Sequence, residues 1–349
     1  MLSTETDLVA VGDDELLRYA ERVKDKVVLI TEASKGIGKE TAIRFGFYGA
    51  KVVVGDQDTS GAQAIAHEIV TTGGAAISAS CNATVWDDVV ALFDLAVKTY
   101  GGLDIVVANT GVTEVGQFTH VSLDSNGKPM QPDLTTVEVN LVGILHVVHL
   151  AQYYLARKRQ PNDLKALVML GSIGKQLYDS NQLSRIYITY TASWHCLPQA
   201  PLYSASGCAV LGTMRTLYPD LEHKDIRTAV ISPSFSVSDN DSFVEVSLKG
   251  LALSPIARVA DSIFYAATNP EKETNGRAWL IRDDGPLYMI PREDLNEGVF
   301  RTYNKRFNAL ISAIDAVSRF SRNPGEYLMR PSLLIIALGF FGSYAYSVL

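Results

Sequence analysis

Residues 25–290 alternate between two patterns of hydrophobic and polar positions. Short runs of consecutive apolar residues are separated by longer segments in which apolar residues recur every three or four positions. A short apolar run is typical of a strand buried on both faces, and the longer spacing is typical of an amphipathic helix. The alternation predicts an α/β domain with a doubly wound parallel sheet of about seven strands. We expect these strands over residues 27–31, 51–55, 76–81, 103–108, 166–170, 227–231 and 278–281.

The segments between these strands predict the helices of the domain. The longest apolar periodicities cover residues 135–159 and 203–222, and shorter ones cover 60–72 and 87–100. Ahead of the first strand, residues 13–23 predict a short acidic helix within an N-terminal segment of residues 1–24.

The chain changes character after residue 290. Residues 291–327 predict an amphipathic, basic helical tail, which would pack on the domain or lie on a membrane surface. Residues 331–349 contain no charged side chain, and 17–25 residues is roughly the length that crosses a bilayer core. Because Arg319, Arg322 and Arg330 precede this stretch, we expect residues 328–349 to be a single-pass membrane anchor with the domain facing the cytosol. The alternative is a buried or interfacial helix in a cytoplasmic protein.

Composition narrows the class of partner. The 349 residues carry a formal net charge of −7, with 47% hydrophobic and 20% charged residues, so the chain is globular and an unlikely nucleic-acid binder. Three cysteines are too few for a disulfide framework, and no cluster of metal ligands has a recognisable spacing. We expect no metal site.

A glycine-bearing turn follows the first expected strand. Gly36 and Gly38 lie where a strand meets a helix, and such a turn lets the backbone approach a pyrophosphate at the helix N-terminus. Asp56 ends the second strand, where a carboxylate binds the adenosine ribose hydroxyls and repels a 2′-phosphate. These residues predict a dinucleotide site that favours NAD over NADP.

The chain resembles the short-chain dehydrogenase/reductase family over residues 25–290. The family motif Thr-Gly-x-x-x-Gly-x-Gly corresponds to Thr31-Glu-Ala-Ser-Lys-Gly-Ile-Gly38, and Asn-Ala-Gly corresponds to Asn109-Thr-Gly111. The family's helical Asn is matched by Asn140 and its catalytic Ser by Ser172. Its Tyr-x-x-x-Lys pair is half matched by Tyr203-Ser-Ala-Ser-Gly207. The resemblance implies a Rossmann-like, NAD(P)-dependent oxidoreductase that interconverts a hydroxyl and a carbonyl.

The resemblance also implies a role for each matched residue. Tyr203 would exchange a proton with the substrate oxygen, Ser172 would hydrogen-bond that oxygen, and Asn140 would hold a water in the proton relay. The implied cofactor-binding residues are Thr31, Ser34, Gly36, Ile37, Gly38, Asp56, Asn82, Asn109, Gly111 and Tyr203. By the same analogy, a homo-oligomer would form through helices 135–159 and 203–222. The membrane anchor suggests that the small-molecule substrate is lipophilic.

Four positions depart from the family pattern. Gly207 replaces the lysine that lowers the tyrosine pKa and binds the nicotinamide ribose. Glu32 replaces the first glycine of the phosphate turn, where a carboxylate is unfavourable for a bound pyrophosphate. Asn82 stands for an adenine-contacting Asp, and Ser234 for a turn glycine. These departures support an alternative function: an impaired or non-redox member of the family, such as a binding or scaffold protein, an isomerase or a cyclase.

Two further features bear on the active site. Tyr154 and Lys158 also have the Tyr-x-x-x-Lys spacing, but they lie in the helix before the fifth strand, so we interpret this match as chance. The spacing from Ser172 to Tyr203 is wider than in the family. The excess, residues 174–192, would be either a substrate lid or a gene-model artefact.

Overall fold

The computed structural model describes residues 8–157, 163–171, 200–234 and 252–290, with isolated positions 302, 306 and 309. The compact unit described below extends from Thr4 to Pro291. The segment 174–192, predicted to be a substrate lid or a gene-model artefact, lies outside the described residues. So do the expected anchor and nearly all of the helical tail. In the described part of the chain, no helix is both long and apolar enough to span a membrane. The anchor therefore stays a prediction.

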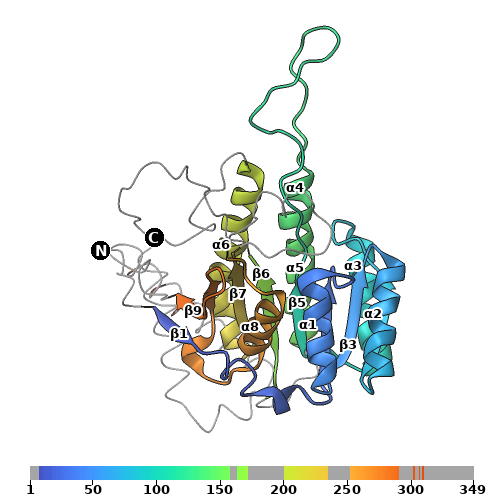
Figure 1. Ribbon diagram of the computed structural model, residues 1–349, viewed down its shortest axis with the longest axis vertical. Coiled ribbons are helices and arrows are strands. Elements are labelled where there is room, and N and C mark those ends of the chain that lie inside the picture. Colours follow the sequence, from blue (N-terminus) through green and yellow to red (C-terminus); the bar gives the residue numbers. More distant parts are fainter. Residues whose placement is uncertain are drawn as a thin grey trace, which may run out of the picture. The chain divides into compact units, whose positions relative to one another are not determined.

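Nine strands of the described residues form one sheet in the order β1-β9-β8-β7-β6-β5-β2-β3-β4 (Figure 1). Strands β2 to β8 are parallel, and β9 and β1 add antiparallel pairs at one edge. The strands are β1 (Val9–Val11), β2 (Val27–Thr31), β3 (Lys51–Asp56), β4 (Ala75–Ser80), β5 (Ile105–Ala108), β6 (Ala166–Leu170), β7 (Arg227–Pro233), β8 (Arg277–Ile281) and β9 (Leu287–Ile290). The doubly wound α/β fold predicted from the sequence is confirmed.

Helices cover both faces of the sheet, and successive residues of each strand point to opposite faces. Val27 and Leu29 of β2 belong to a core shared with α3, α5 and α6, whereas Val28 and Ile30 belong to a core shared with α1, α2 and α8. The α-helices are α1 (Gly36–Phe47), α2 (Thr59–Thr71), α3 (Trp86–Tyr100), α4 (Thr135–Val137), α5 (Ile144–Leu155), α6 (Pro201–His223) and α8 (Ile256–Thr268). Because β2 is buried on both faces, its sequence is a continuous apolar run.

The N-terminal segment differs from its prediction. Residues 13–19 form hydrogen-bonded turns, and only Ala20–Val23 forms a short 3-10 helix in place of the expected acidic helix. The segment is anchored by the buried Leu16 and Val23, and β1 joins the sheet through β9. Residues 9–23 thus contribute a strand to the sheet and buried side chains to its core.

The predicted helix over residues 135–159 is not regular. A π-helix over Glu138–Gly143 separates α4 from α5. Single π-turns within helices are frequent at functional sites, and this one contains Asn140.

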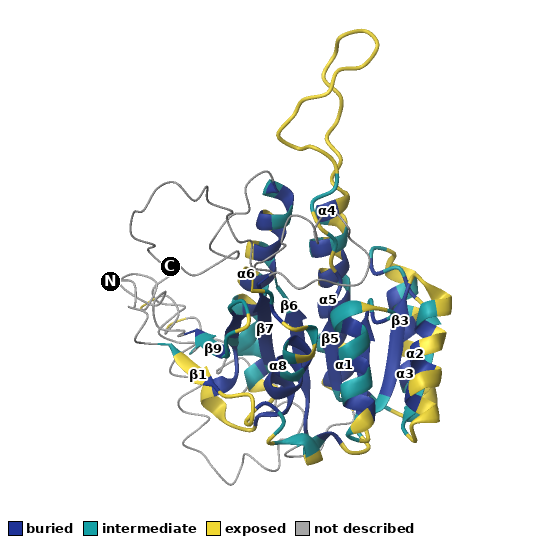
Figure 2. Ribbon diagram, in the orientation of Figure 1, coloured by how far each residue is buried: buried dark blue, intermediate teal, exposed yellow. Residues whose placement is uncertain are grey.

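An arm formed by residues 116–134 projects from the chain between β5 and α4 (Figure 1). It turns back on itself through the Leu123–Pro129 bridge and the hydrogen bond from the Asp124 amide to the Lys128 carbonyl. Almost all of it is exposed (Figure 2). The sequence pattern gave no sign of this arm, because its few apolar residues follow neither period.

Candidate active site

The candidate site lies at the carboxyl ends of β2 and β5. These neighbouring strands are the point at which the strand order reverses, since β3 and β4 lie on one side of β2 and β6 and β7 on the other side of β5. In open parallel sheets, ligands bind in the crevice outside the strand ends at such a reversal. We call this region the β2–β5 crevice; it is bounded by residues 31–38 and 109–112.

The turn after β2 forms a close-packed cradle. Helix α1 begins at Gly36, whose φ of +57° favours glycine, and no side chain caps the helix at Lys35. A Cβ added at Gly38 would lie 2.3 Å from the Glu32 carbonyl oxygen and 2.5 Å from Asn109 Nδ2. Glycine is therefore required at residue 38 to bring α1 against the crevice. The first amide groups of α1 suit an anion.

Asp56 closes the β3 side of the crevice. Its carboxylate is 6% exposed and accepts hydrogen bonds from the Ser34 amide and the Asp58 amide, each at 2.9 Å. Each oxygen accepts one of these bonds, so a second acceptor position remains on each for a ribose hydroxyl.

Asn109 links the ends of β2 and β5. Its Nδ2 donates to the carbonyl oxygens of Thr31 at 3.2 Å and Glu32 at 3.0 Å. The Thr31 hydroxyl accepts from the Asn109 amide and lies 3.0 Å from the Thr110 hydroxyl. Asn109 Oδ1 is buried and has no hydrogen-bond partner among the residues that the structure describes. Buried polar atoms are nearly always paired, so this oxygen marks an acceptor at the base of the crevice.

Glu32 lies across the crevice. Its Oε2 accepts a hydrogen bond from the Gly111 amide at 2.9 Å, and its φ is +50°. Burial raises the pKa of this carboxyl and nearby Asp56 raises it further, while the Gly111 hydrogen bond and Lys35 lower it. The sequence predicted a carboxylate that opposes a bound pyrophosphate. The structure adds that this carboxylate bridges the two strand ends.

Asn140 fixes the loop that leaves the crevice. Its Oδ1 accepts from the Val112 amide at 2.7 Å and its Nδ2 donates to the Val112 carbonyl at 2.8 Å. Thr136 also holds this loop, because its hydroxyl accepts from the Val115 amide at 2.8 Å. Among the described residues, Asn140 thus has a clear positioning function, and its expected water-holding function stays a prediction.

Glu114 connects this loop to the helix that carries Tyr203. Its carboxylate accepts from the Tyr203 amide at 2.7 Å and the Leu202 amide at 3.3 Å. These two amides belong to the first turn of α6, whose own N-cap residue, Ala200, gives no side-chain cap. Sequence reasoning missed Glu114. The one available signal was that α6 begins at Ala200-Pro201 with no residue of its own to cap it.

The remaining candidate positions are placed as follows. Ser172 lies outside the described residues, so its predicted position beside Tyr203 stays a prediction. Gly207 is buried in α6, one helical turn after Tyr203.

The Asn82 side-chain oxygen accepts from the amide and hydroxyl of Thr84, so it shapes the turn before α3. Ser234 lies 2.7 Å from the Ser254 hydroxyl and accepts from the Asp283 amide, so its hydroxyl holds together three loops.

Tyr154 is part of the core. Its hydroxyl donates to Asp94 of α3 at 2.6 Å. Burial and this acidic partner raise its pKa to about 12, which does not suit proton transfer near neutrality. The second Tyr-x-x-x-Lys spacing therefore has a structural explanation.

Comparison with known proteins finds a matching family model, similar sequences and similar folds. A family model described as short chain dehydrogenase matches residues 26–163. The chain is 32% identical over 156 residues to short-chain dehydrogenase/reductase ascJ of Acremonium egyptiacum, covering 43% of this chain and 49% of the relative. It is 26% identical over 252 residues to a 3-oxoacyl-[acyl-carrier-protein] reductase of Synechocystis sp., covering 70% of this chain and 90% of the relative. The chain belongs to the short-chain dehydrogenase/reductase family.

Solved structures of the family share the fold. A 3-ketoacyl-(acyl-carrier-protein) reductase from Brucella melitensis, complexed with NADH, superimposes with a TM-score of 0.60 at 22% identity. The match covers 75% of this chain and 98% of the reductase. The family uses NAD(H) or NADP(H).

The described residues fit the adenosine and pyrophosphate end of such a dinucleotide. The glycine cradle at α1 would hold the pyrophosphate, Asp56 would bind the ribose hydroxyls, and Asn109 supplies an unpaired buried acceptor. The fit is poorer beside Tyr203, because Gly207 supplies no amine for the nicotinamide ribose. In the described part of the chain, no group of three or more His, Cys, Asp or Glu side chains is placed to hold a metal.

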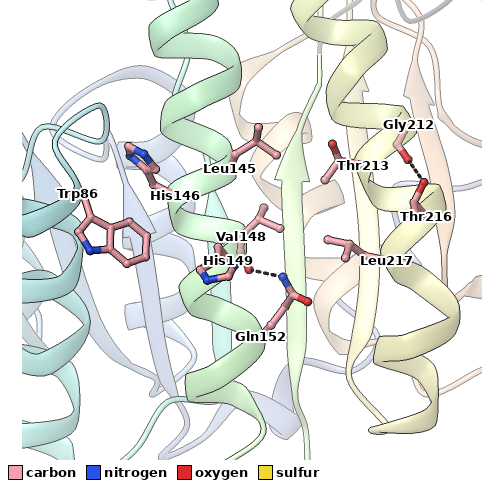
Figure 3. A pocket seen from close by; sticks show the side chains of 10 residues that line it. All are labelled: Trp86, Leu145, His146, Val148, His149, Gln152, Gly212, Thr213, Thr216 and Leu217. Carbon is pink, nitrogen blue, oxygen red and sulfur yellow. Dashed lines mark hydrogen bonds between the residues drawn. The ribbon is translucent and has the colours of Figure 1, made fainter. Parts of the chain in front are cut away.

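A groove of about 830 Å³ runs along α5 and α6, outside the crevice (Figure 3). It is lined by Trp86, Leu145, His146, Val148, His149, Gln152, Gly212, Thr213, Thr216 and Leu217. None of the cofactor-binding or catalytic candidates that the structure describes is among these lining residues. The groove lies on the two helices expected at an oligomer interface, and the oligomer stays a prediction.

Proposed function

We propose that this protein is an NAD(H)-dependent oxidoreductase that interconverts a hydroxyl and a carbonyl group on a lipophilic small molecule. One observation carries the proposal: a single loop connects the dinucleotide crevice to the helix of the acid–base tyrosine. The loop begins at Gly111 in the crevice, is clamped by Asn140 at Val112, and reaches the Tyr203 amide through Glu114. The two halves of a hydride-transfer site are thereby held in a fixed relation.

Each half has a defined task in this reaction. A dinucleotide held by the α1 cradle and Asp56 would supply the hydride chemistry at the substrate carbon. The Tyr203 hydroxyl donates a proton to the carbonyl oxygen during reduction and removes it during oxidation. Glu114 orients Tyr203 through the backbone of α6, and Asn140 keeps the connecting loop in register.

The preference for NAD(H) rests on the acidic side of the crevice. Asp56 is buried at the end of β3, and each of its oxygens already accepts one backbone hydrogen bond. A 2′-phosphate on the adenosine ribose would be repelled by this carboxylate, and two ribose hydroxyls would not.

The lipophilic character of the substrate is supported by the sequence of residues 331–349. A membrane-tethered domain facing the cytosol meets substrates that partition into the bilayer.

The glycine at residue 207 favours a second candidate function. Gly207 is buried one helical turn after Tyr203, where the resemblance calls for a lysine that lowers the tyrosine pKa. Loss of such tuning reduces acid–base catalysis by about 10²–10⁴-fold. The second candidate is therefore a protein that binds the dinucleotide and a ligand without efficient hydride transfer.

The two candidates are separated by turnover. NADH oxidation is followed with the full-length protein and a panel of aliphatic, aromatic and steroidal ketones, alongside Gly207→Lys and Gly207→Ala. The proposed function predicts turnover by the unmodified protein and faster turnover by Gly207→Lys. Turnover confined to Gly207→Lys would support the second candidate. The alanine variant shows whether any side chain is tolerated at residue 207.

A further inference from the structure

Glu32 occupies a backbone position that ordinarily belongs to glycine. Its φ of +50° lies in the left-handed region, which costs a residue with a Cβ about 1–2 kcal/mol. Its carbonyl oxygen accepts from Asn109 Nδ2 at 3.0 Å, and the tight approach of Gly38 holds the same peptide. The direction of the Glu32 side chain is therefore set by the strand ends themselves.

That direction takes the carboxyl group across the β2–β5 crevice. Oε2 reaches the Gly111 amide, 2.9 Å away, on the other strand end. A dinucleotide held by the α1 cradle and Asp56 passes through this crevice, since both lie at the reversal of strand order. The Glu32 carboxyl would consequently face the dinucleotide along its path.

Both an acidic and a basic side chain lie near the Glu32 carboxyl group. Asp56 approaches from the end of β3 and Lys35 from the turn before α1. Cys81 directly follows β4. Burial, together with the nearby carboxylates, including Glu32, raises the pKa of its thiol to about 12, so the thiol is neutral. Burial and Asp56 together outweigh Lys35 and the Gly111 amide, so the pKa of Glu32 lies above its usual range. The two phosphates of a dinucleotide would oppose the ionised form further.

We propose that dinucleotide binding to this protein is proton-linked through Glu32: the crevice takes up the dinucleotide with Glu32 protonated, and affinity falls as the pH rises. The inference rests on the proposed function, because it concerns the same crevice. Protonated Glu32 still accepts from Gly111 through one oxygen and gains an O–H that can donate to the ligand. Ionised Glu32 places a third negative charge beside the phosphates.

The test is calorimetric titration of NADH into the full-length protein at several values between about pH 5 and about pH 8, a window that begins just above the ordinary glutamate pKa of about 4.3. The same titration in buffers of different ionisation enthalpy gives the number of protons taken up. We expect tighter binding at lower pH, with a change of up to about tenfold per pH unit, and net proton uptake. Glu32→Gln should bind more tightly than the wild type at higher pH and lose most of the pH dependence.

Two further variants keep the result interpretable. Glu32→Gly restores the residue that suits φ +50°, and it should behave like Glu32→Gln even if the glutamine variant folds poorly. Asp58→Asn removes a neighbouring exposed carboxylate that caps α2, and it should retain the pH dependence of the wild type. Binding with the same pH dependence in the wild type and both Glu32 variants would overturn this inference and leave the proposed function intact. No NADH binding by any variant at any of these pH values would overturn both.

Discussion

The two ends of the active site preserve the family pattern to different degrees. In the β2–β5 crevice the motif is altered, yet the geometry is complete: Gly38 packs against Asn109, Asp56 is buried and bonded, and Glu32 bridges to Gly111. At the start of α6 the tyrosine is present, yet its lysine is replaced by Gly207. Under the proposed function, dinucleotide binding and proton transfer would depend on separate sets of residues, which a mutation can affect independently.

The difference also shows how each end is stabilised. The crevice is held by hydrogen bonds between strand ends, so a substitution at Glu32 changes its electrostatics without removing the cradle. Among the described residues, the start of α6 is capped by a carboxylate from another loop, Glu114, and Ala200 supplies no side-chain cap. A single change at Glu114 should therefore affect the chemistry more than the binding.

The largest expected effect comes from removing the acid–base group at the α6 end. Tyr203→Phe should lower turnover by about 10²–10⁴-fold and change NADH affinity much less, because the hydroxyl that it removes acts in proton transfer to the substrate oxygen. Steady-state kinetics and NADH titration measure the two quantities. Tyr154→Phe is the matched control, since it removes a hydroxyl bonded to Asp94 in the core. Equal losses of turnover in both variants would contradict the assignment of Tyr203.

A substitution in the β2–β5 crevice should instead reduce NADH affinity. Gly38→Ala would place a Cβ 2.3 Å from the Glu32 carbonyl oxygen, so α1 must move away from the strand ends. We expect a loss of about 1–3 kcal/mol in the free energy of unfolding, together with a marked loss of NADH affinity. Gly102→Ala is the control, because no described residue beyond its two chain neighbours has an atom within 4 Å of the added Cβ. Unaltered NADH binding by Gly38→Ala would show that the dinucleotide does not use this cradle.

A smaller effect tests the connection between the two ends. Glu114→Ala removes the cap of α6 and should cost about 1 kcal/mol of stability. Because Tyr203 then loses its fixed position, turnover should fall by about 10-fold or more at saturating NADH, while NADH affinity stays unchanged. Glu114→Gln, which keeps one acceptor oxygen, should recover part of the turnover.

Asp58→Ala is the control for Glu114→Ala, since it removes a comparable carboxylate cap from α2. It should lose similar stability and keep its turnover at saturating NADH. If the two variants lose turnover equally, Glu114 supports only the fold.

The smallest effect concerns stability and pH. Because the pKa of Glu32 is raised in the folded protein, the folded state holds this proton more tightly than the unfolded chain. The corresponding stability is complete below the unfolded glutamate pKa of about 4.3 and is lost as the pH rises through the raised value. The Tm of the wild type should therefore fall relative to that of Glu32→Gln across this window. A difference in Tm that does not change with pH would argue against the raised pKa.

Much of the fold could be predicted from the sequence, and the reason is burial. Strands such as β2 and β6 are buried on both faces, so their apolar runs marked them with the correct limits. Strands β1 and β9 have three and four residues and show no clear hydrophobic pattern in the sequence. They are held in the sheet by antiparallel pairing, β1 with β9 and β9 with β8. The π-helix at Asn140 likewise depends on tertiary contacts, here the clamp on Val112.

The candidate site divides in the same way. Gly36, Gly38, Asp56 and Asn109 could be found because their positions follow strand ends in a known order. Glu114 could not, because its partners lie 88 and 89 residues away in the chain. The direction of the Glu32 side chain was also hidden, since it depends on the distance between β2 and β5 rather than on the turn that contains it.

The proposed function requires the β2–β5 crevice to hold NAD(H) in front of Tyr203. Calorimetric titration of NADH and NADPH into the unmodified, full-length protein slightly below neutral pH tests this requirement. We expect micromolar binding of NADH, with weaker binding of NADPH because of Asp56. If neither dinucleotide binds, the proposed function is wrong and the family fold serves another ligand here.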